Sequence, residues 1–148
     1  MSGTYQRITV LDLLHYRNDA PGGHHVLNAA RRSGKTTSIV KMVERLPWRC
    51  IVVFPTQQIH QASARLFTVD PIPAIVTHLE RQDLSQFQRT LRSTYAGKRA
   101  EHPADTLIFD EYGWFADRRG LCSAISEVLV PNFLIPNFTT FYLGSPND

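Results

Sequence analysis

The sequence predicts one α/β domain whose mostly parallel sheet is flanked by helices. Two segments, 50–54 and 106–109, are continuous runs of apolar and β-branched residues, which are typical of strands buried in a parallel sheet. Segments with apolar residues three or four positions apart alternate with the strands, as helices do between parallel strands. No linker, repeat or low-complexity block divides the 148 residues, and this length is usual for a single domain. We therefore expect residues 1–148 to form one domain.

The first half of the chain begins with apolar spacing from Ile8 to Leu14, which predicts a short helix followed by a turn-rich loop. Residues 25–29 predict a short strand, and the apolar residues beyond Gly34 repeat at helical spacing until Pro47. The buried strand at 50–54 comes next. A second helix follows it, with an apolar face formed by Ile59, Ala62, Leu66 and Phe67.

The second half continues the alternation. A short strand is expected at 73–77, and an apolar stripe then predicts a helix through 84–95. The buried strand at 106–109 is followed by a helix that runs through 121–129 and stops at Pro131. A last strand is expected at 138–143. In such folds ligands bind at the carboxyl ends of the strands, so these ends are the places to look for chemistry.

Composition narrows the class of protein only slightly. Sixteen Lys and Arg residues against thirteen Asp and Glu give a net charge of +3, which permits contact with a polyanion without predicting one. Cys50 and Cys122 lack ligand spacing, so we expect reduced core thiols, and the scattered histidines are expected to be solvated or packed. No apolar run approaches the roughly 18 residues of a membrane span, and we expect a cytoplasmic protein.

Residues 29–36 follow the phosphate-loop pattern G-x-x-x-x-G-K-[ST], except that Ala29 replaces the first glycine. Such loops bind phosphate through backbone amides, a lysine and a hydroxyl that ligates Mg²⁺. A chance tetrapeptide on a solvated helix start is the alternative, but a strand before the loop and a helix after it favour a site for ATP and Mg²⁺. The predicted nucleotide-binding residues are Ala30, Arg31, Arg32, Ser33, Gly34, Lys35, Thr36 and Thr37.

Two further strand ends carry polar residues. The strand at 106–109 runs into Asp110 and Glu111, which suit a carboxylate that holds Mg²⁺ and one that orients the attacking water. Taken alone, the pair would more simply be a strand end followed by a solvated turn. The strand at 138–143 runs into Gly144 and Ser145, where a small hydroxyl could sense the γ-phosphate or simply form a turn.

These three stretches together resemble, in order and spacing, the ATPase domain of the large terminase subunit of tailed bacteriophages, which is a DNA-packaging motor. The segment 51–58, a strand followed by a helix, extends the resemblance over nearly the whole chain. The resemblance implies a P-loop NTPase of the additional-strand, catalytic-glutamate class that hydrolyses ATP. It also implies translocation of double-stranded DNA into a procapsid, in the host cytoplasm. The implied partners are the portal, the procapsid, the small terminase subunit and other copies of the chain in a ring.

The same resemblance implies a role for each residue of the predicted site. Three residues would be catalytic, because they bind or activate the reacting groups: Lys35, Arg31 and Glu111. Two would hold Mg²⁺, namely Thr36 and Asp110. Gly144 and Ser145 would belong to the motif that couples hydrolysis to DNA movement.

The sequence also departs from that family. No cluster of metal-binding aspartates is present, so nuclease activity is not predicted. Because the chain stops just after the strand at 138–143, we expect the strand at 25–29 to lie at an unpaired sheet edge, as in a fragment, a split subunit or a minimal relative. Two other functions remain open: a helicase-like DNA-dependent ATPase, and an ATP-binding assembly subunit without turnover.

Overall fold

The computed structural model describes residues 5–7, 22–28, 40–41, 43–44, 49–65, 74–110, 115 and 120–144. The predicted helix at 8–14 and the end of the second helix, Leu66 and Phe67, lie outside these residues. Strands and helices alternate within them from β3 onward. The elements are β1 (Tyr5–Arg7), β2 (His24–Asn28), β3 (Cys50–Phe54), α3 (Gln57–Ala64), β4 (Ala74–Val76), α4 (Leu84–Tyr95), β5 (Ala104–Asp110), α5 (Leu121–Leu129) and β6 (Leu134–Gly144).

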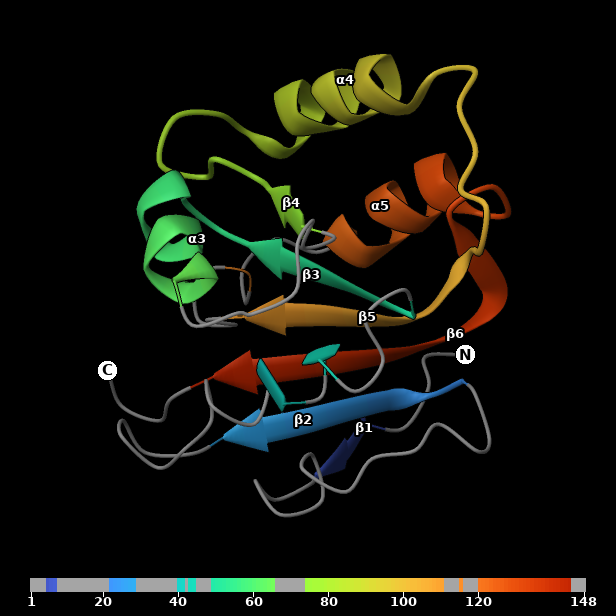
Figure 1. Cartoon of the computed structure of the whole chain (residues 1–148). Coiled ribbons are helices and arrows are strands. Elements are labelled where there is room, and N and C mark those ends of the chain that lie inside the picture. Colours follow the sequence, from blue (N-terminus) through green and yellow to red (C-terminus); the bar gives the residue numbers. More distant parts are fainter. Residues whose placement is uncertain are drawn as a thin grey trace.

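The six described strands form one parallel sheet in the order β1-β2-β6-β5-β3-β4 (Figure 1). The predicted α/β class with a parallel sheet is therefore confirmed. Chain order and sheet order differ, because the chain leaves β2 for β3 and returns to β2 only with its last strand. As a result β6 stands between β2 and β5.

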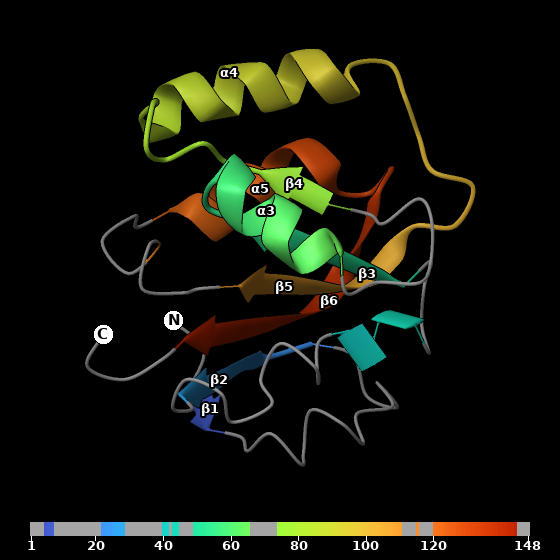
Figure 2. The same cartoon turned by 60° about the vertical axis from the view of Figure 1, so that its left-hand side comes forward.

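The sheet has helices on both faces. Side chains alternate along a strand, so Leu107 and Phe109 of β5 point to one face and Ile108 and Asp110 to the other. The face of Phe109 is covered by α4 and α5, which pack side by side and share one apolar core with it (Figures 1 and 2). On the opposite face, the ring of Phe54 in β3 contacts His60 of α3 at 5.0 Å between centroids. Asp110 lies on this α3 face.

Local sequence explains where the helices begin. The side chain of Asp83 accepts a hydrogen bond from the backbone of Gln86, and the Gln86 side chain accepts one from the backbone of Asp83, which together form a capping box for α4. Phe87 and Leu91 are the buried residues of that helix. Thr56 caps α3 in a similar way, by accepting from Ile59 at 3.1 Å. No described helix has the length and apolar character needed to cross a membrane.

The sheet edge beside β2 differs from the prediction. We expected this strand to be unpaired on one side, which is wrong, because β1 pairs with it in parallel: Tyr5 lies opposite His24 and Arg7 opposite Val26. The flanking strand comes from the start of the chain. It was missed because a three-residue strand with the sequence Tyr-Gln-Arg has no apolar run to mark it.

Candidate functional site

Three neighbouring strands end level with one another at the carboxyl edge of the sheet. Leu143 of β6 lies opposite Leu27 of β2 on one side and opposite Asp110 of β5 on the other. Val53 of β3 pairs with Phe109, so β3 ends in step with β5. Adjacent strands are about 4.8 Å apart, which places the end of β2 about 10 Å from the backbone of Asp110. A phosphate chain with its metal can span such a gap.

Asp110 is the predicted metal-binding residue that the structure describes. It is the last residue of β5, and only 3% of its surface is exposed. A carboxylate buried to this degree requires hydrogen-bond donors or a cation nearby, because loss of water is costly for a charge. Carboxylate oxygen is also a preferred ligand of Mg²⁺. The position and chemistry of Asp110 therefore fit the metal role.

Gly144 is the last residue of β6 and pairs with Asn28, the last residue of β2. It lies one residue beyond Leu143, which is opposite Asp110. The predicted coupling position is thus interposed between the strand that leads to the phosphate-loop pattern and the strand that ends in the carboxylate. A residue there lies next to both strand ends.

The remaining predicted site residues lie outside the described residues, but their flanks are described. β2 leads the chain to the carboxyl edge, and residues 40, 41, 43 and 44 are helical, with Val40 and Val43 buried. A strand before the loop and a helix after it are therefore present, as predicted. The residues outside are Ala30, Arg31, Arg32, Ser33, Gly34, Lys35, Thr36, Thr37, Glu111 and Ser145.

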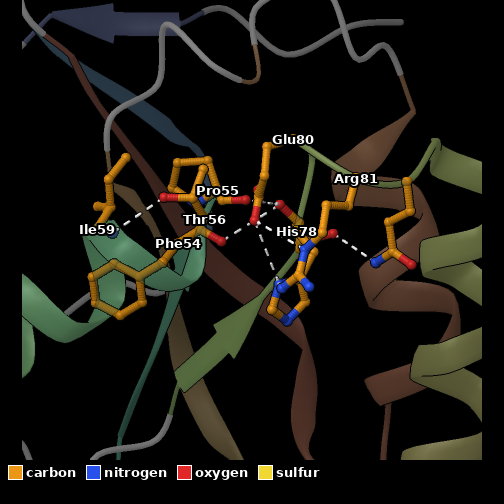
Figure 3. A network of polar contacts seen from close by, with 9 residues as sticks. Phe54, Pro55, Thr56, Ile59, His78, Glu80 and Arg81 are labelled. Carbon is orange, nitrogen blue, oxygen red and sulfur yellow. Dashed lines mark hydrogen bonds and ion pairs between the residues drawn. The ribbon is translucent and has the colours of Figure 1, made fainter.

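The same edge holds polar residues that the sequence did not single out. α3 starts at this edge, directly after β3, with Thr56 as its cap, so the positive end of the helix dipole lies here. The first turn of α3 has no acidic side chain to offset it. The hydroxyl of Thr77, just beyond β4, donates to the carbonyl of Pro55 at 3.1 Å (Figure 3 shows the surrounding contacts). The strand-ending Pro55 followed by a capping threonine was the available signal for this helix start.

Two histidines attach β2 to β6. The ring of His25 stacks on Phe141 at 5.0 Å, and the ring of His24 stacks on Tyr142 at 5.8 Å. The Tyr142 hydroxyl also lies 3.2 Å from Nδ1 of His24. Burial, and then the nearby charge of His24, lower the pKa of His25, so its ring is neutral at neutral pH. The strand that leads to the loop is thus held by aromatic packing.

Titratable clusters elsewhere are few. Among the residues that the structure describes, no group of three or more His, Cys, Asp or Glu side chains is arranged to hold a metal ion. Neither Cys50, which is buried, nor Cys122 forms a disulfide with a described residue, and burial raises the pKa of Cys122. Burial disfavours the charged thiolate, which is the reactive form of cysteine, so neither thiol points to nucleophilic chemistry. The strand ends around Asp110 are therefore the best candidate site.

No protein-family model matches the chain, and no match is found among curated proteins or solved structures. The function has to be inferred from the fold and from the residues at the strand ends.

Proposed function

We propose that this chain is a Mg²⁺-dependent ATPase of the additional-strand, catalytic-glutamate class and serves as the motor domain of a DNA-packaging machine. The observation that carries the proposal is the position of β6. It separates the strand that precedes the phosphate-loop pattern from the strand that ends in Asp110. The class takes its name from a strand inserted at that place. A simple alternation of strands and helices along the chain would not require β6 to lie between β2 and β5.

The strand order supports a different role for each of three strand ends. ATP would bind over the end of β2, with Lys35 and the loop amides on its phosphates and the Thr36 hydroxyl on the metal. Asp110, at the end of β5, would be a further ligand of the metal. Its backbone lies about 10 Å from the end of β2, a gap that the phosphates and the metal would fill. When bound, Mg²⁺ neutralises charge on the phosphates. Gly144 and Ser145, at the end of the intervening strand, would respond to the γ-phosphate.

Hydrolysis would then depend on residues of this chain that position water and charge. Glu111 follows the metal-binding Asp110 and would orient the attacking water or accept its proton. Arg31 in the loop would stabilise the negative charge that grows on the γ-phosphate. Along the chain, Glu111 follows the buried strand β5, and the phosphate-loop pattern follows β2.

The choice of double-stranded DNA as the transported polymer depends on the resemblance of the three motifs to terminase motors. The same resemblance favours a ring of identical subunits working with a portal, a procapsid and a small terminase subunit. β1 pairs the edge of β2 that would otherwise be open. The two alternative functions, helicase-like unwinding and nucleotide binding without turnover, predict different results in the experiments below.

Two substitutions test the site. Lys35→Ala should abolish ATP binding, because the main cationic contact to the β- and γ-phosphates is removed. Glu111→Ala should bind ATP with nearly the affinity of the wild type and lose hydrolysis by at least a factor of about 100. Binding is measured by titration with a fluorescent ATP analogue, and turnover by phosphate release with and without duplex DNA.

Unchanged turnover in the Glu111 variant would refute the catalytic assignment. ATP binding without hydrolysis by the wild-type chain, even with DNA present, would favour the binding-only subunit. Strand separation of a duplex driven by ATP would favour the helicase-like function. Lys41→Ala is a matched control, since Lys41 is an exposed lysine on the helix after the loop and should leave both measurements unchanged.

A further inference from the structure

An open groove of about 570 Å³ lies just beyond β4, at the carboxyl edge of the sheet. It runs from the turn after β4 onto the outer face of α4. Its lining contains two guanidinium groups, and the carboxylate of Glu80 lies beside it, 3.6 Å from Nε of Arg81. All of the lining residues are polar: His78, Arg81, Gln82, Gln86, Arg89 and Thr90. Such a surface suits an anion better than a membrane or an apolar peptide.

The helix presents its donors along one stripe. Gln86, Arg89 and Thr90 are three and four positions apart, so they share an exposed face of α4, whereas Phe87 and Leu91 are buried. The side-chain oxygen of Gln86 accepts from the backbone of Asp83 at 3.1 Å, which leaves its NH₂ group available as a donor. The stripe therefore offers N–H groups to whatever lies in the groove.

The turn supplies the second cation. Arg81 is 69% exposed, with Nη2 at 3.3 Å from Nδ1 of His78 and Nε at 3.6 Å from Glu80 (Figure 3). The same ring nitrogen of His78 lies 3.7 Å from the Glu80 carboxylate. Glu80 holds one edge of the guanidinium in place. The groove thus combines a positioned arginine from the turn with Arg89 from the helix.

The turn is fixed to the same carboxyl edge of the sheet as Asp110, on the edge strand β4, two strands from β5. The backbone N–H of Thr77 donates to the carbonyl of Phe54 at 2.9 Å, and the carbonyl of His78 accepts from the backbone of Arg81 at 2.9 Å. Phe54 ends β3, the neighbour of the Asp110 strand. His78 adopts a left-handed backbone conformation, with φ of 53°. The groove is thus joined to the edge where hydrolysis would occur.

We propose that this groove binds the phosphate backbone of duplex DNA; the choice of DNA as the occupant rests on the proposed motor function. Its openness favours a polymer that runs across it, because sites for small ligands enclose most of the ligand surface. Arginine and amide donors are the groups that contact backbone phosphates without regard to sequence. The groove would couple ATP turnover to DNA, since it lies at the same edge of the sheet as Asp110.

The test measures binding of a fluorescent duplex to the full chain by anisotropy, without nucleotide, over a series of salt concentrations. Arg81→Gln/Arg89→Gln removes two cations and keeps hydrogen-bonding side chains. We expect weaker binding at each salt concentration and a slope of log K against log salt that is smaller in magnitude by about 2, since each phosphate contact contributes about 0.9. Arg89→Gln alone should lower the slope by about half as much.

Arg92→Gln is the matched control. Arg92 lies on the same helix, is 59% exposed and pairs with Glu127 at 3.6 Å, but it does not line the groove. Its substitution should leave the affinity and the slope unchanged. Equal losses in the Arg92 variant would mean that net charge alone governs binding and would overturn the proposal. An unchanged slope in the double variant, or absence of DNA binding by the wild type, would overturn it as well.

Competition with inorganic phosphate and with an acidic peptide distinguishes DNA from other ligands of the groove. Inorganic phosphate or an acidic peptide that binds through Arg81 and Arg89 while DNA does not would assign the groove to a different ligand and contradict the proposal. The outcome is independent of the ATPase: DNA binding through the groove can persist in a chain that fails to hydrolyse ATP. Conversely, normal turnover with unaltered DNA binding by the groove variants would remove this inference and leave the proposed function standing.

Discussion

β5 and β2, the two strands that lead to the proposed chemistry, are held in different ways. β5 is paired on both sides, by β3 and β6, and six of its seven residues are buried. β2 is paired with β6 and with the short strand β1, and its residues His24, His25 and Val26 are only half-buried. One strand is fixed by the apolar core, whereas the other combines its backbone pairing with two histidine rings stacked on β6.

The difference indicates what each strand end can do. A carboxylate at the end of a fully packed strand keeps its position, as a metal ligand must. The strand that precedes the phosphate-loop pattern gains less from the core, so its position depends more on its pairing, on the histidine contacts and, in the proposed function, on the nucleotide. Ligand binding would therefore stabilise the β2 side of the sheet more than the β5 side.

The largest expected effect is on the β5 side. Phe109 is 1% exposed, and its ring stacks on Tyr142 and meets Phe115 edge-on. Phe109→Ala should lower the free energy of unfolding by about 3–5 kcal/mol, because a large cavity is left in the core. Val26→Ala on β2 should lower it by about 1 kcal/mol, since Val26 is half-buried. Denaturant unfolding followed by circular dichroism measures both. Similar losses for the two variants would contradict the contrast between the strands.

A smaller effect concerns pH and belongs to β2. The pKa of His25 in the folded chain is lowered below 6.5 by burial and by His24, so the unfolded state binds more protons as the pH falls below 6.5. The stability that neutral His25 contributes is therefore complete above pH 6.5 and is lost as the pH falls through the folded pKa. His25→Phe keeps the ring stack on Phe141 and should reduce this loss, as measured by unfolding at a series of pH values.

The exposed His102 provides the control for that experiment, because His102→Phe changes a histidine outside the packed sheet. A reduced loss in both variants would trace the effect to the added apolar ring and not to His25. If His25→Phe and the wild type lose the same stability between neutral and acid pH, then His25 does not control the attachment of β2.

Strongly packed elements could be predicted from the sequence. β3 has the predicted bounds, 50–54, because its apolar run is buried on both faces. α4 occupies the predicted 84–95, because its apolar stripe and the Asp83 cap agree. β6 was predicted at 138–143 but starts at Leu134. Its pairing with β5 is irregular between Ala104 and Thr106, and this irregular stretch accommodates Pro136, which hid the start of the strand.

The site could be predicted only in part, because only the residues next to a strongly packed strand carry a sequence pattern. Asp110 follows a buried strand and was found from that pattern. The groove beside α4 was not found, because Arg81 and Arg89 come from a turn and a helix and form no motif. Only folding places them together. The position of β6 between β2 and β5 is likewise a property of the sheet, since the order of strands along the chain does not specify their order in space.

The most direct test of the central claim compares two aspartates of the same strand. Asp110→Asn removes the proposed metal ligand at the carboxyl end of β5 and should lower Mg²⁺-dependent ATP hydrolysis by at least a factor of about 100. Asp105→Asn weakens the 2.7 Å ion pair with Arg49 near the other end and should cost about 1 kcal/mol of stability while hydrolysis is retained. Wild-type hydrolysis by the Asp110 variant would contradict the assignment of this sheet edge as an ATPase site.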